Sequence, residues 1–239
     1  MKNFNDDFTL FTEKILSGEN FAFARYADGE VCLMKGKEIG IGSQAFHVDK
    51  WRAPKEMTIV GEELLETLGH TEPNYYYAIS AHTDSMDDYT FLTERIKTDN
   101  ITFANLWINA NYQKMKAFYM SFNREVYLIC NHAASQNSYP FTVAEIFAFP
   151  DDCISYWEQY GDDYLRQLSA YISEIKNQTI FISAGPVSEI LIHRLYRINP
   201  HNQYIDVGSS LDEFTHRGAT RPYMNPESTY AKEISVFYE

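Results

Sequence analysis

Apolar residues recur along the chain with two alternating periodicities. Short apolar runs, typical of buried strands, are separated by longer segments with apolar residues at every third or fourth position, as on one face of a helix. The first pattern predicts strands over Phe21–Tyr26, Tyr75–Ser80, Ile101–Ala104, Val126–Cys130, Thr179–Ser183 and Gln203–Val207. The second predicts helices over Asp6–Leu16, Pro54–Leu68, Tyr89–Lys97, Asn111–Phe122, Asp162–Lys176 and Val187–Ile198. This alternation favours an α/β fold with a mostly parallel sheet flanked by helices.

The length and composition of the chain narrow its class. Its 239 residues fit the size of one α/β domain, and they contain no internal repeat, low-complexity tract or linker. We therefore predict that residues 1–239 form a single domain. Hydrophobic residues make up 45% of the chain, enough for a globular core. The formal net charge of −13 argues against nucleic acid as a partner, because phosphate backbones attract basic proteins.

The chain carries no pattern typical of a membrane-spanning or secreted protein. Its apolar runs are far shorter than the ~18 residues that indicate a membrane span. The first residues are acidic and polar, unlike a signal peptide, so we expect a cytoplasmic protein. The three cysteines, Cys32, Cys130 and Cys153, have no paired short spacing. This disfavours a disulfide framework and a zinc site, and favours buried thiols.

Two carboxylates follow the first predicted strand. In open α/β sheets, ligands bind outside the carboxyl ends of the strands. Here the segment Arg25–Glu30 places Asp28 and Glu30 on either side of a glycine, where a tight turn could aim both carboxylates at one cation. Hard oxygen ligands suit Mn²⁺ or Mg²⁺ shared with a diphosphate. The structural alternative is a helix with Asp28 as its N-cap and Glu30 in its first turn.

Two other strand ends carry polar residues of less specific meaning. The segment Asn105–Tyr112 combines three amides with two aromatic rings, which suits recognition of a sugar or base. Asn105 and its neighbours are also typical turn and cap residues. After Val126–Cys130, His132 could bind a phosphate or carry a proton near neutral pH. A lone histidine is more often structural, so both interpretations stay open.

The last two strands are also followed by candidate ligand-binding residues. The small-residue turn Ala184–Pro186 opens a helix whose backbone N–H groups can receive phosphate or ribose oxygens. It matches neither the P-loop nor the dinucleotide fingerprint, which disfavours an ATPase and an NAD-dependent dehydrogenase. Asp206 ends the final strand and precedes a glycine turn with Ser209. Downstream, Arg217 and Arg221 either clamp an anion or form surface ion pairs.

In their order along the chain, four short motifs resemble those of the bacterial glycosyltransferases of the GT-D fold, formerly described as a domain of unknown function. The motifs are Phe23–Glu30, Ala184–Pro186, Tyr204–Ser209 and Thr220–Tyr223. The resemblance spans most of the chain and implies a Rossmann-like domain. In that family an Asp-x-Glu motif binds a metal. Here Ala27 stands where glycine is common, beside the carboxylates.

The resemblance implies that Asp28 and Glu30 hold Mn²⁺ or Mg²⁺. A divalent cation or arginines can stabilise the charge that develops on a departing phosphate. As hypotheses we assign donor binding to Arg25, Asn105, Gly185, Ser209, Arg217 and Arg221. We assign proton transfer, or recognition of a hydroxyl group, to Glu30, Asp206 and His132.

The resemblance also implies the reaction partners. The expected donor is a nucleotide-diphosphate sugar, with UDP-hexose favoured. The expected acceptor is a bacterial glycan, a lipid-linked glycan or a glycoprotein, as in polysaccharide biosynthesis. Such acceptors are compatible with peripheral association at the inner face of the cell membrane, without a membrane span.

Two other classes of function stay open on the sequence alone. A methyltransferase that uses S-adenosylmethionine would share the parallel sheet and the acid at a strand end. The glycine-rich turn that usually follows its first strand is absent here. A non-catalytic interaction domain would explain the 18 tyrosines as an aromatic protein surface. Binding of S-adenosylmethionine would favour the first class, and binding of neither nucleotide nor metal would favour the second.

Overall fold

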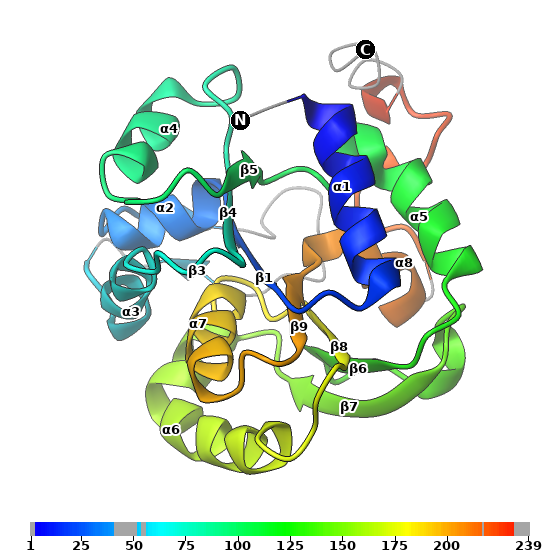
Figure 1. The fold of residues 1–239 in the computed structure, drawn as a ribbon. Coiled ribbons are helices and arrows are strands. Elements are labelled where there is room, and N and C mark those ends of the chain that lie inside the picture. Colours follow the sequence, from blue (N-terminus) through cyan, green and yellow to red (C-terminus); the bar gives the residue numbers. More distant parts are fainter. Residues whose placement is uncertain (1–2, 41–51, 54–55, 217, 232–239) are drawn as a thin grey trace.

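A computed structural model describes residues 3–40, 52–53, 56–216 and 218–231. Its main sheet has seven strands in the order β5-β4-β1-β9-β8-β6-β7, and every neighbouring pair is parallel (Figure 1). The strands are β1 (Ala22–Tyr26), β4 (Tyr75–Ile79), β5 (Ile101–Phe103), β6 (Val126–Asn131), β7 (Val143–Phe149), β8 (Thr179–Ile182) and β9 (Gln203–Asp206). A small antiparallel pair joins β2 (Ile39–Gly40) to β3 (Arg52–Ala53). The predicted α/β fold is confirmed.

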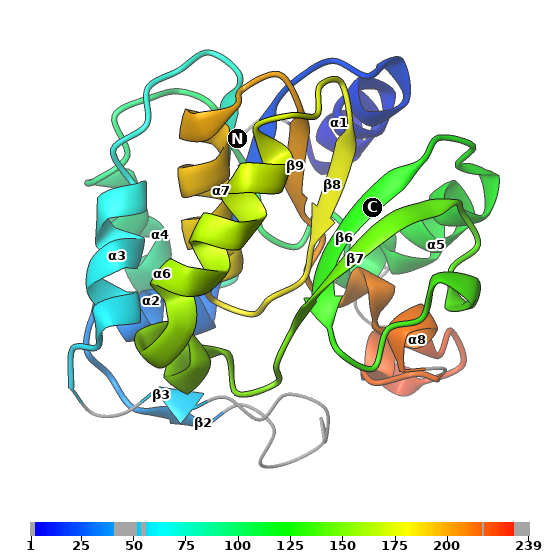
Figure 2. The ribbon, with the colours of Figure 1, turned by 90° about the horizontal axis from the view of Figure 1, so that it is seen from below.

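Helices cover both faces of the sheet. Figure 2 shows α2, α3, α6 and α7 on one side and α1, α5 and α8 on the other. The α-helices are α1 (Phe4–Ser17), α2 (Asp28–Met34), α3 (Ile59–Thr67), α4 (Met86–Thr93), α5 (Tyr112–Ser121), α6 (Cys153–Ile172), α7 (Ser188–Ile198) and α8 (Asp212–Thr215). The 3-10 helices are η1 (Asn109–Asn111), η2 (Gln136–Ser138), η3 (Gly208–Leu211) and η4 (Pro222–Met224). Within the described ranges, no helix is long and apolar enough to cross a membrane.

The central strand β1 shows why the sheet needs helices on both faces. Ala22, Ala24 and Tyr26 are fully buried in the core under α2, α3, α6 and α7. Phe23, between them, is fully buried in the opposite core with Phe11 of α1. Successive side chains of a strand point to opposite faces. An apolar run without alternation therefore fits a strand that is covered on both sides.

The sequence prediction misses some elements and misplaces the bounds of others. Strand β7 is missed because it lies at the sheet edge and most of its residues are partly exposed, which blurs its apolar pattern. Helix α2 corresponds to the helix that the sequence offered as the structural alternative for Asp28 and Glu30, and it begins at Asp28 itself. Helix α6 begins at Cys153 rather than Asp162, and α4 ends at Thr93 rather than Lys97.

The strand order reverses direction between β1 and β9. From β1 the chain passes through α2 and α3 to β4 and β5 on one side, whereas β9 is reached through β8 and α7 on the other. The carboxyl ends of β1 and β9 therefore flank the point where connections leave the sheet in opposite directions. Such a switch point is where open α/β sheets bind their ligands.

Candidate active site

A buried ion pair joins the two strands at the switch point. Arg25 of β1 donates from Nε to Oδ2 of Asp206, the last residue of β9, over 3.0 Å. The Asp206 side chain is only 2% exposed, and its Oδ1 accepts the N–H of Gly208 at 2.7 Å. Gly208 has φ +51°, and a Cβ there would lie 2.8 Å from an Arg25 nitrogen. Glycine is thus required both for the turn and for the close approach of the guanidinium.

Glu30 lies next to this pair and also begins α2. Its Oε2 accepts the N–H of Ala27 at 2.8 Å, so Ala27 is the N-cap and Glu30 closes the first turn. The expectation of Asp28 as N-cap is wrong, because Asp28 is already the first helical residue, where it is exposed. Burial raises the pKa of Glu30 to about 7, although Arg25 lowers it.

Glu189 completes the buried cluster, and sequence reasoning missed it. It is fully buried in the first turn of α7, and its Oε1 accepts the backbone N–H of Arg25 at 3.3 Å. Burial raises the pKa of Glu189 well above its ordinary value, and the negative charges of Asp206 and Glu30 raise it further. The raised pKa favours the neutral form of this carboxyl. Sequence gave no signal, because an acid in a helix's first turn is ordinarily solvated.

Asp28 and Glu30 are the right kind of ligands for a hard divalent cation, but two residues are too few to hold one alone. Both offer carboxylate oxygens, the ligands that Mn²⁺ and Mg²⁺ prefer. No group of three or more His, Cys, Asp or Glu residues in the described part of the chain could hold a metal by itself. A cation at this pair would therefore take its other ligands from water or from a bound molecule such as a diphosphate.

The last strand's turn and the Thr220–Tyr223 motif meet in space. The hydroxyl of Ser209 lies 2.5 Å from that of Tyr223. Arg221 places Nη1 3.7 Å from Oδ2 of Asp212, and the two side chains are only 13% and 10% exposed. This ion pair is therefore more buried than the surface pair that the sequence left open. Arg217 lies outside the described residues.

The remaining predicted residues lie further along the same edge. Gly185, with φ +58°, follows β8, and its carbonyl accepts the N–H of Ser188 at 3.0 Å. Asn105 lies beyond β5, which is two strands from β1. His132 is exposed in the turn after β6, two strands from β9. The structure thus brings Arg25, Glu30 and Asp206 together, and it places Asn105 and His132 at other strand ends.

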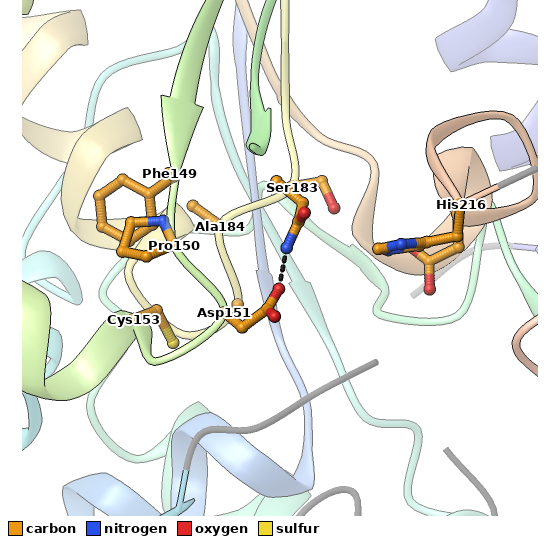
Figure 3. Close-up of a pocket in the computed structure, with 10 residues that line it drawn as sticks. Phe149, Pro150, Asp151, Cys153, Ser183, Ala184 and His216 are labelled. Atoms are coloured by element: carbon orange, nitrogen blue, oxygen red, sulfur yellow. Dashed lines mark hydrogen bonds between the residues drawn. The ribbon is translucent and has the colours of Figure 1, made fainter. Parts of the chain in front are cut away.

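An open pocket lies beside the cluster, beyond the carboxyl ends of β6, β7 and β8 (Figure 3). Its cavity volume is about 60 Å³, and it opens to solvent. Asn131 donates a hydrogen bond to Asp151 on one side, and His216, directly after α8, lies opposite. Its lining residues are Asn131, Phe149, Pro150, Asp151, Cys153, Ser183, Ala184, Gly185, Asp212 and His216. Of these, sequence reasoning had singled out only Gly185.

Comparison with known proteins confirms the fold. No family model matches the chain, and no curated protein does. A solved structure of the domain of unknown function 1792, described as having a distinct glycosyltransferase fold, matches with a TM-score of 0.56 and 15% identity. The match covers 88% of this chain and 81% of that one, and a selenomethionine-substituted structure of the same domain matches equally well. The chain therefore has a glycosyltransferase fold, as the motifs had indicated.

Proposed function

We propose that this protein is a glycosyltransferase. It moves a sugar from a nucleotide-diphosphate donor, preferably a UDP-hexose, to a hydroxyl group of a bacterial glycan, lipid-linked glycan or glycoprotein. The observation that carries the proposal is the charged cluster of Arg25, Glu30, Glu189 and Asp206 at the switch point of a sheet with a glycosyltransferase fold. Buried charge is costly to maintain, and such clusters concentrate where chemistry needs them.

In this proposal Asp28 and Glu30 hold Mn²⁺ or Mg²⁺ together with the donor diphosphate. When bound, the cation stabilises the negative charge that develops on the departing phosphate. Asp28 is exposed at the start of α2, where it can reach a ligand from solvent, whereas Glu30 is 6% exposed and anchored to Ala27. Asp28 thus recruits the donor complex, and Glu30 fixes its place at the end of β1.

The other members of the cluster position these groups. Asp206 has both oxygens engaged by Arg25 and Gly208, so it orients the guanidinium and the turn after β9. The raised pKa of Glu189 favours its neutral form and so reduces the negative charge near that pair. Arg25 carries the positive charge that faces the carboxylates, and Arg221 supplies a second cation near the same turn through its contact with Asp212. Both arginines favour an anionic donor.

Release of nucleoside diphosphate tests the proposal. The protein is incubated with UDP-, dTDP- and GDP-sugars and Mn²⁺, with and without cell extract as a source of acceptors. We expect release from one class of donor, strongest for a UDP-hexose. Asp28→Asn should reduce that release, whereas Asp87→Asn, an exposed acid in the first turn of α4, should not.

Other results would point elsewhere. No release from any donor in the presence of extracts contradicts the enzymatic function. Binding of S-adenosylmethionine in the same preparation would favour a methyltransferase, and binding of neither nucleotide nor metal would favour an interaction domain. Equal loss in Asp28→Asn and Asp87→Asn would place the metal elsewhere.

A further inference from the structure

Apart from Gly185 and the contact of Asp212 with Arg221, the residues that line the pocket of Figure 3 have no part in the donor chemistry above, yet its polar groups are held in place. Asn131, at the end of β6, is tied to Asp151 after β7 by a side-chain hydrogen bond. Asp212 accepts the hydroxyl of Thr220 at 2.8 Å. The buried side chain of Phe149, only 1% exposed, supports the wall beneath them. The pocket therefore presents fixed hydrogen-bonding groups on a rigid base, as small-molecule sites do.

Charge decides which ligand suits this pocket. Its described lining includes the carboxylates Asp151 and Asp212 and the imidazole of His216, and it includes no lysine or arginine. An anionic diphosphate is disfavoured beside two carboxylates, even though Asp212 has an arginine, Arg221, as an ion-pair partner. No described set of three His, Cys, Asp or Glu residues could hold a metal by itself. A neutral molecule rich in hydroxyl groups fits, because carboxylates accept from hydroxyls while the amide of Asn131 can both donate and accept.

Two short segments connect the pocket with the charged cluster. Gly185 lines the pocket, and the chain continues from it into the first turn of α7. That turn contains Glu189, which contacts Arg25. Asp206 belongs to the cluster, and the chain continues from it through η3 to Asp212 in the pocket. A ligand in the pocket is thus a neighbour of a donor bound at the ends of β1 and β9.

We propose that this pocket is the subsite for the acceptor sugar. Asp151 and its partner Asn131 bind ring hydroxyl groups, and His216 contacts the same sugar from the opposite wall. The identification as an acceptor subsite rests on the proposed glycosyl transfer. The binding of a neutral sugar rests only on the chemistry of the pocket.

Saturation-transfer NMR on the full chain tests binding directly, with glucose, galactose and N-acetylglucosamine as probes and UDP as the anionic comparison. We expect transfer to at least one sugar, lost in both Asp151→Asn and His216→Gln. Asp152→Asn is the matched control, because this neighbouring acid is exposed and does not line the pocket. Circular dichroism and thermal melting verify that each variant is folded.

Kinetics then separates the pocket from the donor site. In Asp151→Asn the KM for the acceptor sugar should rise about tenfold, the effect of weakening one charged hydrogen bond. Slow release of nucleoside diphosphate into water, without acceptor, should change less than about twofold, because the donor site is intact. His201→Ala, at an exposed position before β9, should change neither quantity.

The outcomes are distinct for the two proposals. Sugar binding that both pocket variants lose supports the subsite, even if no donor releases its diphosphate, a result that overturns glycosyl transfer alone. Equal sugar binding by the parent and both variants overturns the subsite. So does an absence of saturation transfer to all three sugars, or binding of UDP that is lost in both variants.

Discussion

Helix α7 carries two buried ionisable groups, Glu189 in its first turn and His193 in its middle, and their surroundings differ. Glu189, in the first turn, faces Arg25 and Asp206 at the carboxyl edge of the sheet. His193, one turn later, packs edge-on against His70 with ring centroids 4.5 Å apart, and His70 stacks on Tyr75 at the start of β4. Near Glu189 opposite charges face each other, whereas near His193 aromatic rings pack together.

The difference follows from the partners available to Glu189 and to His193. At the carboxyl edge of the sheet, the guanidinium of Arg25 lowers the pKa of buried Glu30 and so favours its negative charge against the effect of burial. In the middle of α7, burial lowers the pKa of His193 to about 4, and the positive charges of Arg194 and Arg197 lower it further. Its Nδ1 has no hydrogen-bond partner in the described structure. The proposed ligand binding involves the charged surroundings of Glu189, whereas the rings around His193 are expected to contribute to stability.

The largest effect is expected from Arg25→Ala. The substitution leaves buried Asp206 and Glu30 without their positive partner, and breaking a buried pair in this way costs about 3–5 kcal/mol. Urea unfolding measures the loss. Arg166→Ala is the control, because its pair with Asp163 is 74% and 65% exposed and should contribute less than about 1 kcal/mol. Similar losses in the two variants would erase the distinction between a buried and a solvated pair.

Acid should lower the stability of the folded protein through His193, which packs against His70. Its pKa is about 4 in the folded protein and ~6.5 in the unfolded chain, so the unfolded state binds the extra proton between these values. Stability from this group is full above pH 6.5 and falls as the pH drops toward 4. We expect a loss of about 2–3 kcal/mol between pH 7 and 4.5 that is absent in His193→Gln. Urea unfolding at each pH measures this loss of stability. An identical loss in the parent and in His193→Gln would refute the assignment.

Gly208→Ala should cost less, about 1–2 kcal/mol, because alanine is strained at φ +51°. The new Cβ also displaces Arg25, so the variant should weaken binding of UDP with Mn²⁺ in calorimetric titration. Gly218→Ala is the control, since a Cβ there meets nothing within 4 Å. A Gly208→Ala protein with parental stability and affinity would show that the guanidinium position is unimportant.

Glu189→Gln should have the smallest effect, within about 1 kcal/mol at pH 6, because the raised pKa favours the neutral carboxyl, which glutamine resembles. The raised pKa of Glu189 means that its contribution is full below about pH 4.3 and falls as the pH rises. The variant lacks this decline and should gain on the parent between pH 6 and 8. Parallel stability curves over that range would show that Glu189 is ionised in the folded protein.

Local sequence was sufficient for elements with a strong apolar pattern. All six predicted strands occur, because each is a short apolar run; five of them lie inside the sheet, and β5 is at its edge. Strand β7 was missed because it is an edge strand whose residues are mostly partly exposed. Glu189 was missed because the sequence does not distinguish a buried acid from a solvated one. The contact of Arg25 with Asp206 depends on β1 lying beside β9, a pairing between distant parts of the chain that no local pattern encodes.

The residues of the candidate site also divide into those that the sequence indicated and those that only the structure shows. The motifs around Asp28 and Asp206 were visible because acids follow apolar strands there. Asp151, Asp212 and His216 were not singled out, because they follow a missed strand or belong to a short helix, and only the folded chain brings them to one pocket. Sequence thus indicated the donor edge and left the pocket beside it to the structure.

Coupled binding of UDP and Mn²⁺ to Asp28 tests the central claim most directly, by thermal melting of the parent and Asp28→Asn. Either ligand alone should raise the melting temperature little, and both together, at ~100 times the dissociation constant, should stabilise the parent by ~2.7 kcal/mol, or several degrees. Asp28 is exposed, so Asp28→Asn should melt like the parent without ligand and lose the metal-dependent rise. A full rise in Asp28→Asn would contradict the assignment of this edge as the metal and diphosphate site.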